Sequence, residues 1–174
     1  MPRPPSRLEG LTLENGKYRI LALNPGSTST KAALFENETE IWNDTQRYDV
    51  DVIRSFASVT DQEGFRLEAI RDALRRHETR ATDLDAVVGR GGLLKPIPGG
   101  TYLVEAPMLE DVKKCRWGSH ASNLKPSWSV TLAKDRMTST SYLWVSFQIS
   151  VSFSKSATLE IGRASCRERV YACV

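Results

Sequence analysis

Short aliphatic runs separated by polar turns dominate the first part of the chain. The runs at residues 18–23 and 31–35 flank a tight polar loop, which predicts two strands joined by that loop. Residues 38–43 alternate between polar and apolar side chains, as expected for a third, half-exposed strand. A strand of the buried type is predicted at residues 84–88, directly before a glycine-rich segment.

The hydrophobic period changes to that of a helix between residues 61 and 77. The apolar residues on one side of this predicted helix are Phe65, Ile70, Ala73 and Leu74. The charged residues placed elsewhere on it are Arg66, Glu68, Arg71, Asp72 and Arg75. The segment 61–64 is expected to cap its start, and a second helix is predicted at residues 107–117. Strands that alternate with helices indicate an α/β fold.

The end of the chain differs in kind. Ten of the 23 residues from 137 to 159 are Ser or Thr. Apolar and polar residues alternate over 145–153, a pattern that an edge strand shows and that a shifted reading frame also produces by accident. We therefore predict a flexible N-terminal segment (1–17), a folded part (18–124) and an aberrant, poorly ordered tail (125–174).

The composition limits the possible classes of protein. With 174 residues, of which 40% are hydrophobic, the chain is predicted to be one soluble domain. Its 24 basic and 21 acidic side chains leave a spread charge of +3, so neither nucleic acid nor a membrane is expected as a partner. No apolar run is long enough to span a bilayer, and the first residues do not form a secretory signal. Three cysteines without a metal-like spacing predict no disulfide framework, which favours the cytoplasm.

The loop from Asn24 to Lys31 (NPGSTSTK) is the strongest candidate for chemistry. Its glycine is expected to let the backbone turn sharply, and its hydroxyl and backbone N–H groups can surround an anion. The lysine adds a positive charge, so the loop suits a phosphate, although its spacing is not that of a Walker A loop. The alternative is an ordinary polar hairpin turn, which uses the same types of residue.

Arg90 and His120 are two further candidates. Arg90 lies in the glycine-rich segment 89–100, directly after a predicted strand, where its guanidinium can grip an anion or a carboxylate. The alternative for Arg90 is a solvated side chain in a long surface loop. His120 follows the second predicted helix and could be catalytic, structural or simply exposed.

Three segments of the chain resemble one enzyme family. They are Ile20–Lys31 (ILALNPGSTSTK), Val87–Tyr102 (VVGRGGLLKPIPGGTY) and His120–Leu124 (HASNL). Together they resemble the butyrate kinases of the acetate kinase family, in the actin, sugar kinase and Hsp70 superfamily. The resemblance covers residues 18–124. It implies an α/β fold that forms part of a ribonuclease-H-like domain, the first of two such domains around a nucleotide cleft.

The resemblance also implies an activity and a site. Butyrate kinases convert ATP and butanoate to ADP and butanoyl phosphate, with Mg²⁺, by in-line phosphoryl transfer. The residues of the phosphate-side loop would be Asn24, Ser27, Ser29 and Lys31. Arg90 would hold the carboxyl or the transferring phosphoryl group, and His120 would stabilise the transition state. The partners would be a short-chain fatty acid or its acyl phosphate, and family members are usually homo-oligomers.

Several parts of the family's site have no counterpart in the sequence. They are an acidic residue on the strand after the His120 segment, the adenosine-binding segments and the second domain. The chain is therefore expected to be an inactive fragment, with no residue assigned to a metal. The alternatives are a branched-chain fatty-acid kinase, whose motifs are nearly the same, and a non-catalytic fragment with at most weak phosphate binding.

The sequence also predicts a break in the reading frame after Leu124. The family continues there with Gly-Ala and two aliphatic residues, whereas this chain has Lys125–Trp128 (KPSW). Codons for these four residues, read two bases later, encode alanine and two aliphatic residues. Further on, Glu160–Val170 resembles a translated sequencing adapter. The tail is therefore predicted to be out of frame.

Overall fold

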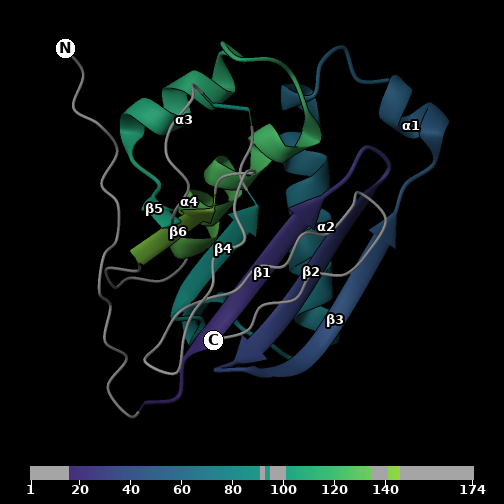
Figure 1. Cartoon of the computed structure of the whole chain (residues 1–174). Helices are drawn as coiled ribbons and strands as arrows, with labels where there is room; N and C mark the ends of the chain where they lie inside the picture. The colour runs from purple at the N-terminus through teal and green to yellow at the C-terminus, as the bar shows by residue number, and fades with distance from the viewer. Residues whose placement is uncertain (1–15, 91–92, 95–100, 135–140, 146–174) are drawn as a thin grey trace.

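A computed structural model describes residues 16–90, 93–94, 101–134 and 141–145 (Figure 1). The strands are β1 (Arg19–Pro25), β2 (Ser29–Glu36), β3 (Thr39–Arg47), β4 (Ala86–Arg90), β5 (Thr101–Leu103) and β6 (Ser141–Val145). The α-helices are α1 (Val50–Arg54), α2 (Glu63–Arg76), α3 (Ala106–Lys113) and α4 (Lys125–Lys134). The short 3₁₀ helices are η1 (Thr60–Gln62), η2 (Ala81–Asp83) and η3 (Ala121–Leu124). In the part of the chain so described, no helix combines the length and the apolar character needed to cross a membrane.

All six strands form one sheet in the order β3-β2-β1-β4-β6-β5. The first three strands form an antiparallel meander, as the hydrophobic pattern predicts. Strands β4 and β6 continue the sheet in parallel with β1, and β5 returns antiparallel to β6. A meander followed by parallel strands is the arrangement of a ribonuclease-H-like domain, so the predicted α/β fold class is confirmed.

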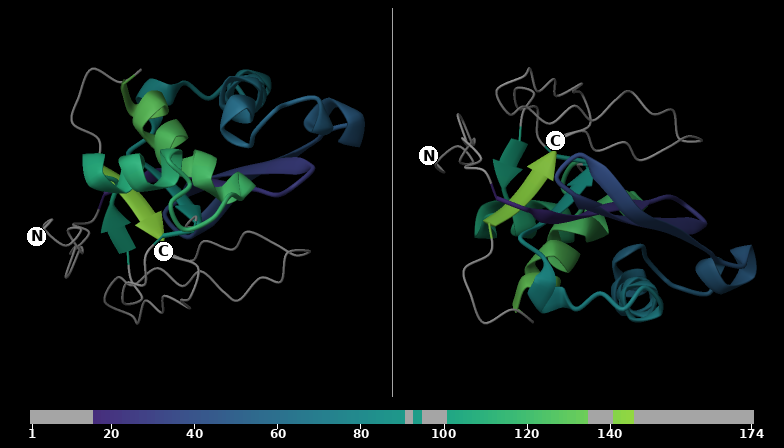
Figure 2. Two further views of the ribbon diagram at one scale, coloured as in Figure 1. Left: turned by 90° about the horizontal axis from the view of Figure 1, so that it is seen from above. Right: turned by 90° about the horizontal axis from the view of Figure 1, so that it is seen from below.

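Helices α2 and α4 pack on the same face of this sheet (Figure 2). Parallel neighbours in a sheet need a crossover connection, and α2 lies in the crossover from the meander to β4. The apolar residues between sheet and helices form the main core. It contains Leu21, Leu23, Ala32, Leu34, Trp42, Leu67, Ile70, Leu74, Leu84, Val87, Leu124, Trp128 and Leu132.

The first predicted helix is present, but its buried face differs from the prediction at two residues. Phe65, expected on the apolar side, is 40% exposed, whereas Arg66 is fully buried. Arg66 lies four residues before Ile70, so helical geometry places both on the same face. The helix begins within the expected cap segment, since Gln62 is its N-cap residue. Gln62 forms no side-chain cap hydrogen bond, however, and Asp61 accepts a hydrogen bond from Ser58 Oγ instead.

The second predicted helix is shorter than expected, because α3 ends at Lys113 and not at residue 117. Cys115 has a φ of 48°, which is the left-handed conformation and cannot continue a right-handed helix. A turn follows to Gly118, whose φ is 117°. Met108 and Val112 are buried as their spacing predicts, in a second cluster with Tyr102.

The described structure continues past Leu124, where the aberrant tail was predicted to begin. Residues 125–134 form α4, and Trp128 and Leu132 reach the main core with 0% and 1% exposure. Strand β6 follows within the same predicted tail. The N-terminal segment 1–15 and residues 146–174, with the adapter-like sequence, lie outside the described residues.

Candidate active site at the carboxyl ends of strands β1 and β4

The candidate anion loop is a tight hairpin between β1 and β2. Its strands are antiparallel and pair Asn24 directly with Lys31, so these two side chains share one face of the sheet. Ser27 is exposed at the tip, and Ser29 is half-buried where β2 begins. The backbone N–H of Gly26 donates to the carbonyl of Ser29 at 2.8 Å and closes the turn.

Gly26 lies in a tight turn, as expected. Its φ is not in the positive range that favours glycine; in the described residues, Gly118 is the glycine with a positive φ. A Cβ atom added at Gly26 would instead lie 3.3 Å from Ser29 Oγ, closer than most such contacts. Gly26 therefore leaves room for the close approach of the Ser29 hydroxyl.

Arg66 of α2 forms hydrogen bonds with the backbone of this loop. Its Nη1 donates to the carbonyls of Gly26 at 2.9 Å and Ser29 at 3.1 Å, and to Thr30 Oγ1 at 3.4 Å. Its Nη2 donates to the Ser27 carbonyl at 2.6 Å. One guanidinium thus binds several oxygens of the loop. Sequence reasoning missed this role because it placed Arg66 away from the apolar side of the helix.

The charge of Arg66 has no acidic partner within the described residues. Its Nε donates to the neutral side chain of Gln62 at 2.9 Å, and the ring of Tyr48 lies 4.9 Å from the guanidinium carbon. Burial lowers the pKa of Arg66 and also raises the pKa of Tyr48. An arginine normally keeps its proton in proteins, so a buried positive charge lies directly behind the loop.

The four predicted side chains of the loop are available for a ligand. They are Asn24, Ser27, Ser29 and Lys31. Within the part of the chain that the structure describes, none of them forms a side-chain hydrogen bond or an ion pair. Most basic side chains on the described surface are paired, such as Lys17 with Glu36 and Arg80 with Asp83. The loop therefore presents an unpaired lysine and three other unpaired polar groups.

Arg90 ends strand β4 beside the end of β1. The two strands are parallel, and their last recorded pair is Leu23 with Gly89, so the backbone of Arg90 lies level with Asn24. The direction of the Arg90 side chain lies outside what the structure describes. In open α/β sheets, ligands bind at the carboxyl ends of parallel strands, which is where both candidates lie.

His120 is held at this edge by Asn123. The buried Asn123 side chain accepts a hydrogen bond from the Leu93 N–H at 3.1 Å and donates to the Gly118 carbonyl at 2.8 Å. Since Leu93 follows the end of β4 closely, these bonds attach the His120 turn to that end. His120 Nδ1 accepts from the Ser122 N–H at 3.1 Å, which fixes the ring against η3. Sequence reasoning assigned no role to Asn123.

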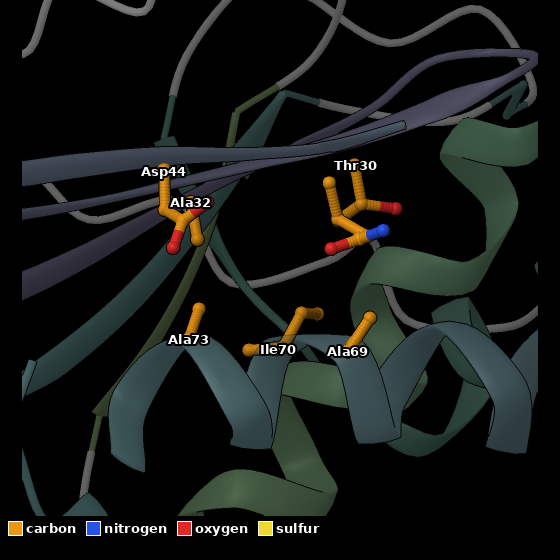
Figure 3. Close-up of a pocket in the computed structure, with 7 residues that line it drawn as sticks. Thr30, Ala32, Asp44, Ala69, Ile70 and Ala73 are labelled. Atoms are coloured by element: carbon orange, nitrogen blue, oxygen red, sulfur yellow. The ribbon is translucent and has the colours of Figure 1, made fainter. Parts of the chain in front are cut away.

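A small pocket lies on the opposite side of the meander, between α2 and strands β2 and β3 (Figure 3). Its lining residues are Thr30, Ala32, Asp44, Gln46, Ala69, Ile70 and Ala73. Burial raises the pKa of Asp44, but hydrogen bonds from Arg76 and His77 outweigh that effect and lower it overall. Asp44 is thus occupied by ion pairs, and the pocket contains no unpaired acid for catalysis.

Two curated relatives match this chain over most of its length. Butyrate kinase 1 of Clostridium acetobutylicum is 47% identical over 118 residues, which are 68% of this chain and 33% of that protein. Butyrate kinase 2 of the same organism is 48% identical over 108 residues, 62% of this chain and 30% of that protein. Over these residues, the chain is a homologue of the butyrate kinases. It spans about a third of the length of these relatives.

Other comparisons add less to this homology. No family model matches the chain. Porphyromonas gingivalis acetate kinase aligns with a TM-score of 0.47 at 15% identity, covering 78% of this chain and 38% of that one. The strand order shows the fold class, and the sequence identity shows the homology.

Proposed function

We propose that the chain carries the phosphate-side wall of a butyrate kinase, an enzyme that converts ATP and butanoate to ADP and butanoyl phosphate. The observation that carries this proposal is the common location of Asn24, Lys31, Arg90 and the His120 turn. All four lie at the carboxyl edge of β1 and β4 in a homologue of these kinases. We also propose that the protein acts in the cytoplasm.

The chemistry needs positioned donors and cations more than covalent catalysis. A carboxylate oxygen of butanoate attacks the γ-phosphorus of ATP, and the bond from that phosphorus to the ADP oxygen breaks. The loop side chains would bind phosphate oxygens, Arg90 would hold the carboxylate or the transferring group, and His120 would donate to the developing charge. The unpaired loop side chains are suited to this anion.

The chain's residues suit the phosphates of ATP better than they suit Mg²⁺. In the described residues, no group of three His, Cys, Asp or Glu is placed to hold a metal ion. Mg²⁺ would therefore bind through the phosphate oxygens of the nucleotide.

A chimera tests the proposed function. Residues 18–124 of this chain replace the aligned third of Clostridium acetobutylicum butyrate kinase 1, and hydroxylamine traps any acyl phosphate formed from ATP and butanoate as a hydroxamate. We expect the chimera to be active, and Arg90→Ala to lower its rate by about 10²–10³-fold, as the loss of one donor to the transition state does elsewhere. The matched control is Arg80→Ala, an exposed arginine paired with Asp83, which should leave the rate unchanged.

The same assay includes the 174-residue chain alone and a branched acid. We expect no product from the chain alone, because holding donor and acceptor in line inside a closed site is worth about 7–11 kcal/mol and this chain forms one wall. A chimera that prefers isobutyrate to butanoate would favour the branched-chain fatty-acid kinase. A folded but inactive chimera, or full activity after Arg90→Ala, would contradict the proposal.

A further inference from the structure

Every carbonyl of the loop from Gly26 to Ser29 is already hydrogen-bonded. Those of Gly26, Ser27 and Ser29 accept from Arg66. The carbonyl of Thr28 accepts from the N–H of Tyr48 at 2.9 Å. These bonds turn the oxygen side of the loop backbone towards the protein.

The N–H groups on the same peptide planes face the other way. In a planar trans peptide, the C=O of one residue and the N–H of the next point in opposite directions. The bonds from Arg66 to the Gly26 and Ser27 carbonyls therefore direct the N–H groups of Ser27 and Thr28 away from Arg66. Within the described residues, neither of these N–H groups donates a hydrogen bond to another protein group.

We propose that Arg66 is the positioning residue of the phosphate loop: its guanidinium fixes the peptide planes so that the Ser27 and Thr28 N–H groups form an anion receptor. This inference rests on the proposed function, because it assumes that the loop receives a phosphate group. Successive N–H groups on one side of a turn are a known way to bind phosphate. Arg66 acts through the backbone and does not touch the ligand.

The choice of arginine follows from the geometry. A guanidinium has five N–H donors in a fixed plane, and Arg66 uses Nε, Nη1 and Nη2 for partners on η1, β2 and the loop. A lysine ammonium has the same charge but lacks this planar fork, so it cannot hold several separate carbonyls in one arrangement. The buried charge, without an acidic partner in the described residues, also adds attraction for an anion at the loop.

The test compares Arg66→Lys with the wild-type chain by NMR. The order parameters of the Ser27 and Thr28 N–H bonds are measured first without ligand, and inorganic phosphate is then titrated. We expect Arg66→Lys to lower both order parameters from about 0.85 to below about 0.6, values typical of rigid and flexible backbone. We also expect the Kd for phosphate to rise about tenfold, the factor to which about 1.4 kcal/mol corresponds. The control is Arg75→Lys, an exposed arginine on the same helix.

The outcomes separate this role from a merely structural one. If Arg66→Lys lowers the melting temperature but leaves the order parameters and the Kd unchanged, Arg66 is only a buried structural residue and the inference is overturned. If the loop loosens in Arg66→Lys while the wild-type chain binds no phosphate, Arg66 still orders the loop, but the anion receptor and the proposed function both fail at this loop.

A second variant keeps the test decisive if Arg66→Lys does not fold. Gln62→Met removes only the acceptor of the Arg66 Nε–H and leaves the charge in place. The same two measurements should then change in the same direction by a smaller amount. Unchanged values in a folded Gln62→Met chain, with Arg66→Lys unfolded, would overturn the inference.

Discussion

Gly118 constrains the His120 turn through its backbone. Its φ of 117° is a conformation that L side chains rarely adopt, and its carbonyl accepts the hydrogen bond from Asn123. A Cβ atom added here would also lie 2.7 Å from Leu93 Cδ1. The leucine side chain can move, so the backbone strain is the larger obstacle to a side chain at this position.

We therefore expect Gly118→Ala to lower the free energy of unfolding by about 1–3 kcal/mol. Urea denaturation followed by circular dichroism measures this change. The matched control is Gly64→Ala in α2, where an added Cβ meets nothing within 4 Å and the change should be neutral or stabilising by up to about 1 kcal/mol. Equal effects at the two glycines would show that the Gly118 conformation is not as described.

At the residue scale, the sequence does not reveal the buried charge behind the candidate loop. The family resemblance, and not loop composition alone, assigns Asn24 and Lys31 to the loop, and the two residues pair across the predicted hairpin. Arg66 was placed away from the apolar face because arginine is rarely fully buried. Its position four residues before Ile70 was the available signal, but its acceptors are carbonyls of a distant loop, and composition does not reveal such partners.

At the scale of elements, helix α4 extends the folded part of the chain beyond Leu124. Trp128 on this helix is fully buried in the main core, and its Nε1 has no hydrogen-bond partner within the described residues. The sequence prediction instead placed the limit of the fold at Leu124. The structure and this prediction imply different contributions of Trp128 to the free energy of unfolding.

If α4 is packed as described, Trp128→Ala should lower the free energy of unfolding by about 3–5 kcal/mol, the usual cost of truncating a buried aromatic side chain. Trp128→Phe should cost less, because it also removes an N–H group without a partner. Trp117→Ala is the control, since Trp117 is 49% exposed and its loss should change stability by less than about 0.5 kcal/mol. An effect at Trp128 as small as at Trp117 would support a fold that ends at Leu124.

The strands and α2 were predictable because their periods are regular and their ends carry turn residues. The early end of α3 was not, because Pro107–Trp117 keeps helical spacing while Cys115 adopts a left-handed conformation. Helix α4 was missed for a different reason. Its segment departs from the family motif, and departure from a motif says nothing about whether apolar residues such as Trp128 and Leu132 can fill a core.

At the scale of the whole molecule, the sheet brings distant segments to one edge. The hairpin loop, the end of β4 and the His120 turn come from separate parts of the chain, and parallel pairing of β1 with β4 places the first two together. Asn123 attaches the third through Leu93. The sequence predicted the three candidates one by one, but their common location depends on strand order and on hydrogen bonds between loops.

The central claim is that this edge is a single anion site, and a titration of the 174-residue chain with inorganic phosphate tests it most directly. Backbone amide shifts in ¹H–¹⁵N spectra report which residues respond. We predict that Ser27, Thr28, Arg90 and His120 shift together with one Kd, and that Lys31→Met weakens binding while Lys113→Met, on the exposed side of α3, does not. Shifts confined to the hairpin loop, or different Kd values for the loop, Arg90 and His120, would contradict a shared site.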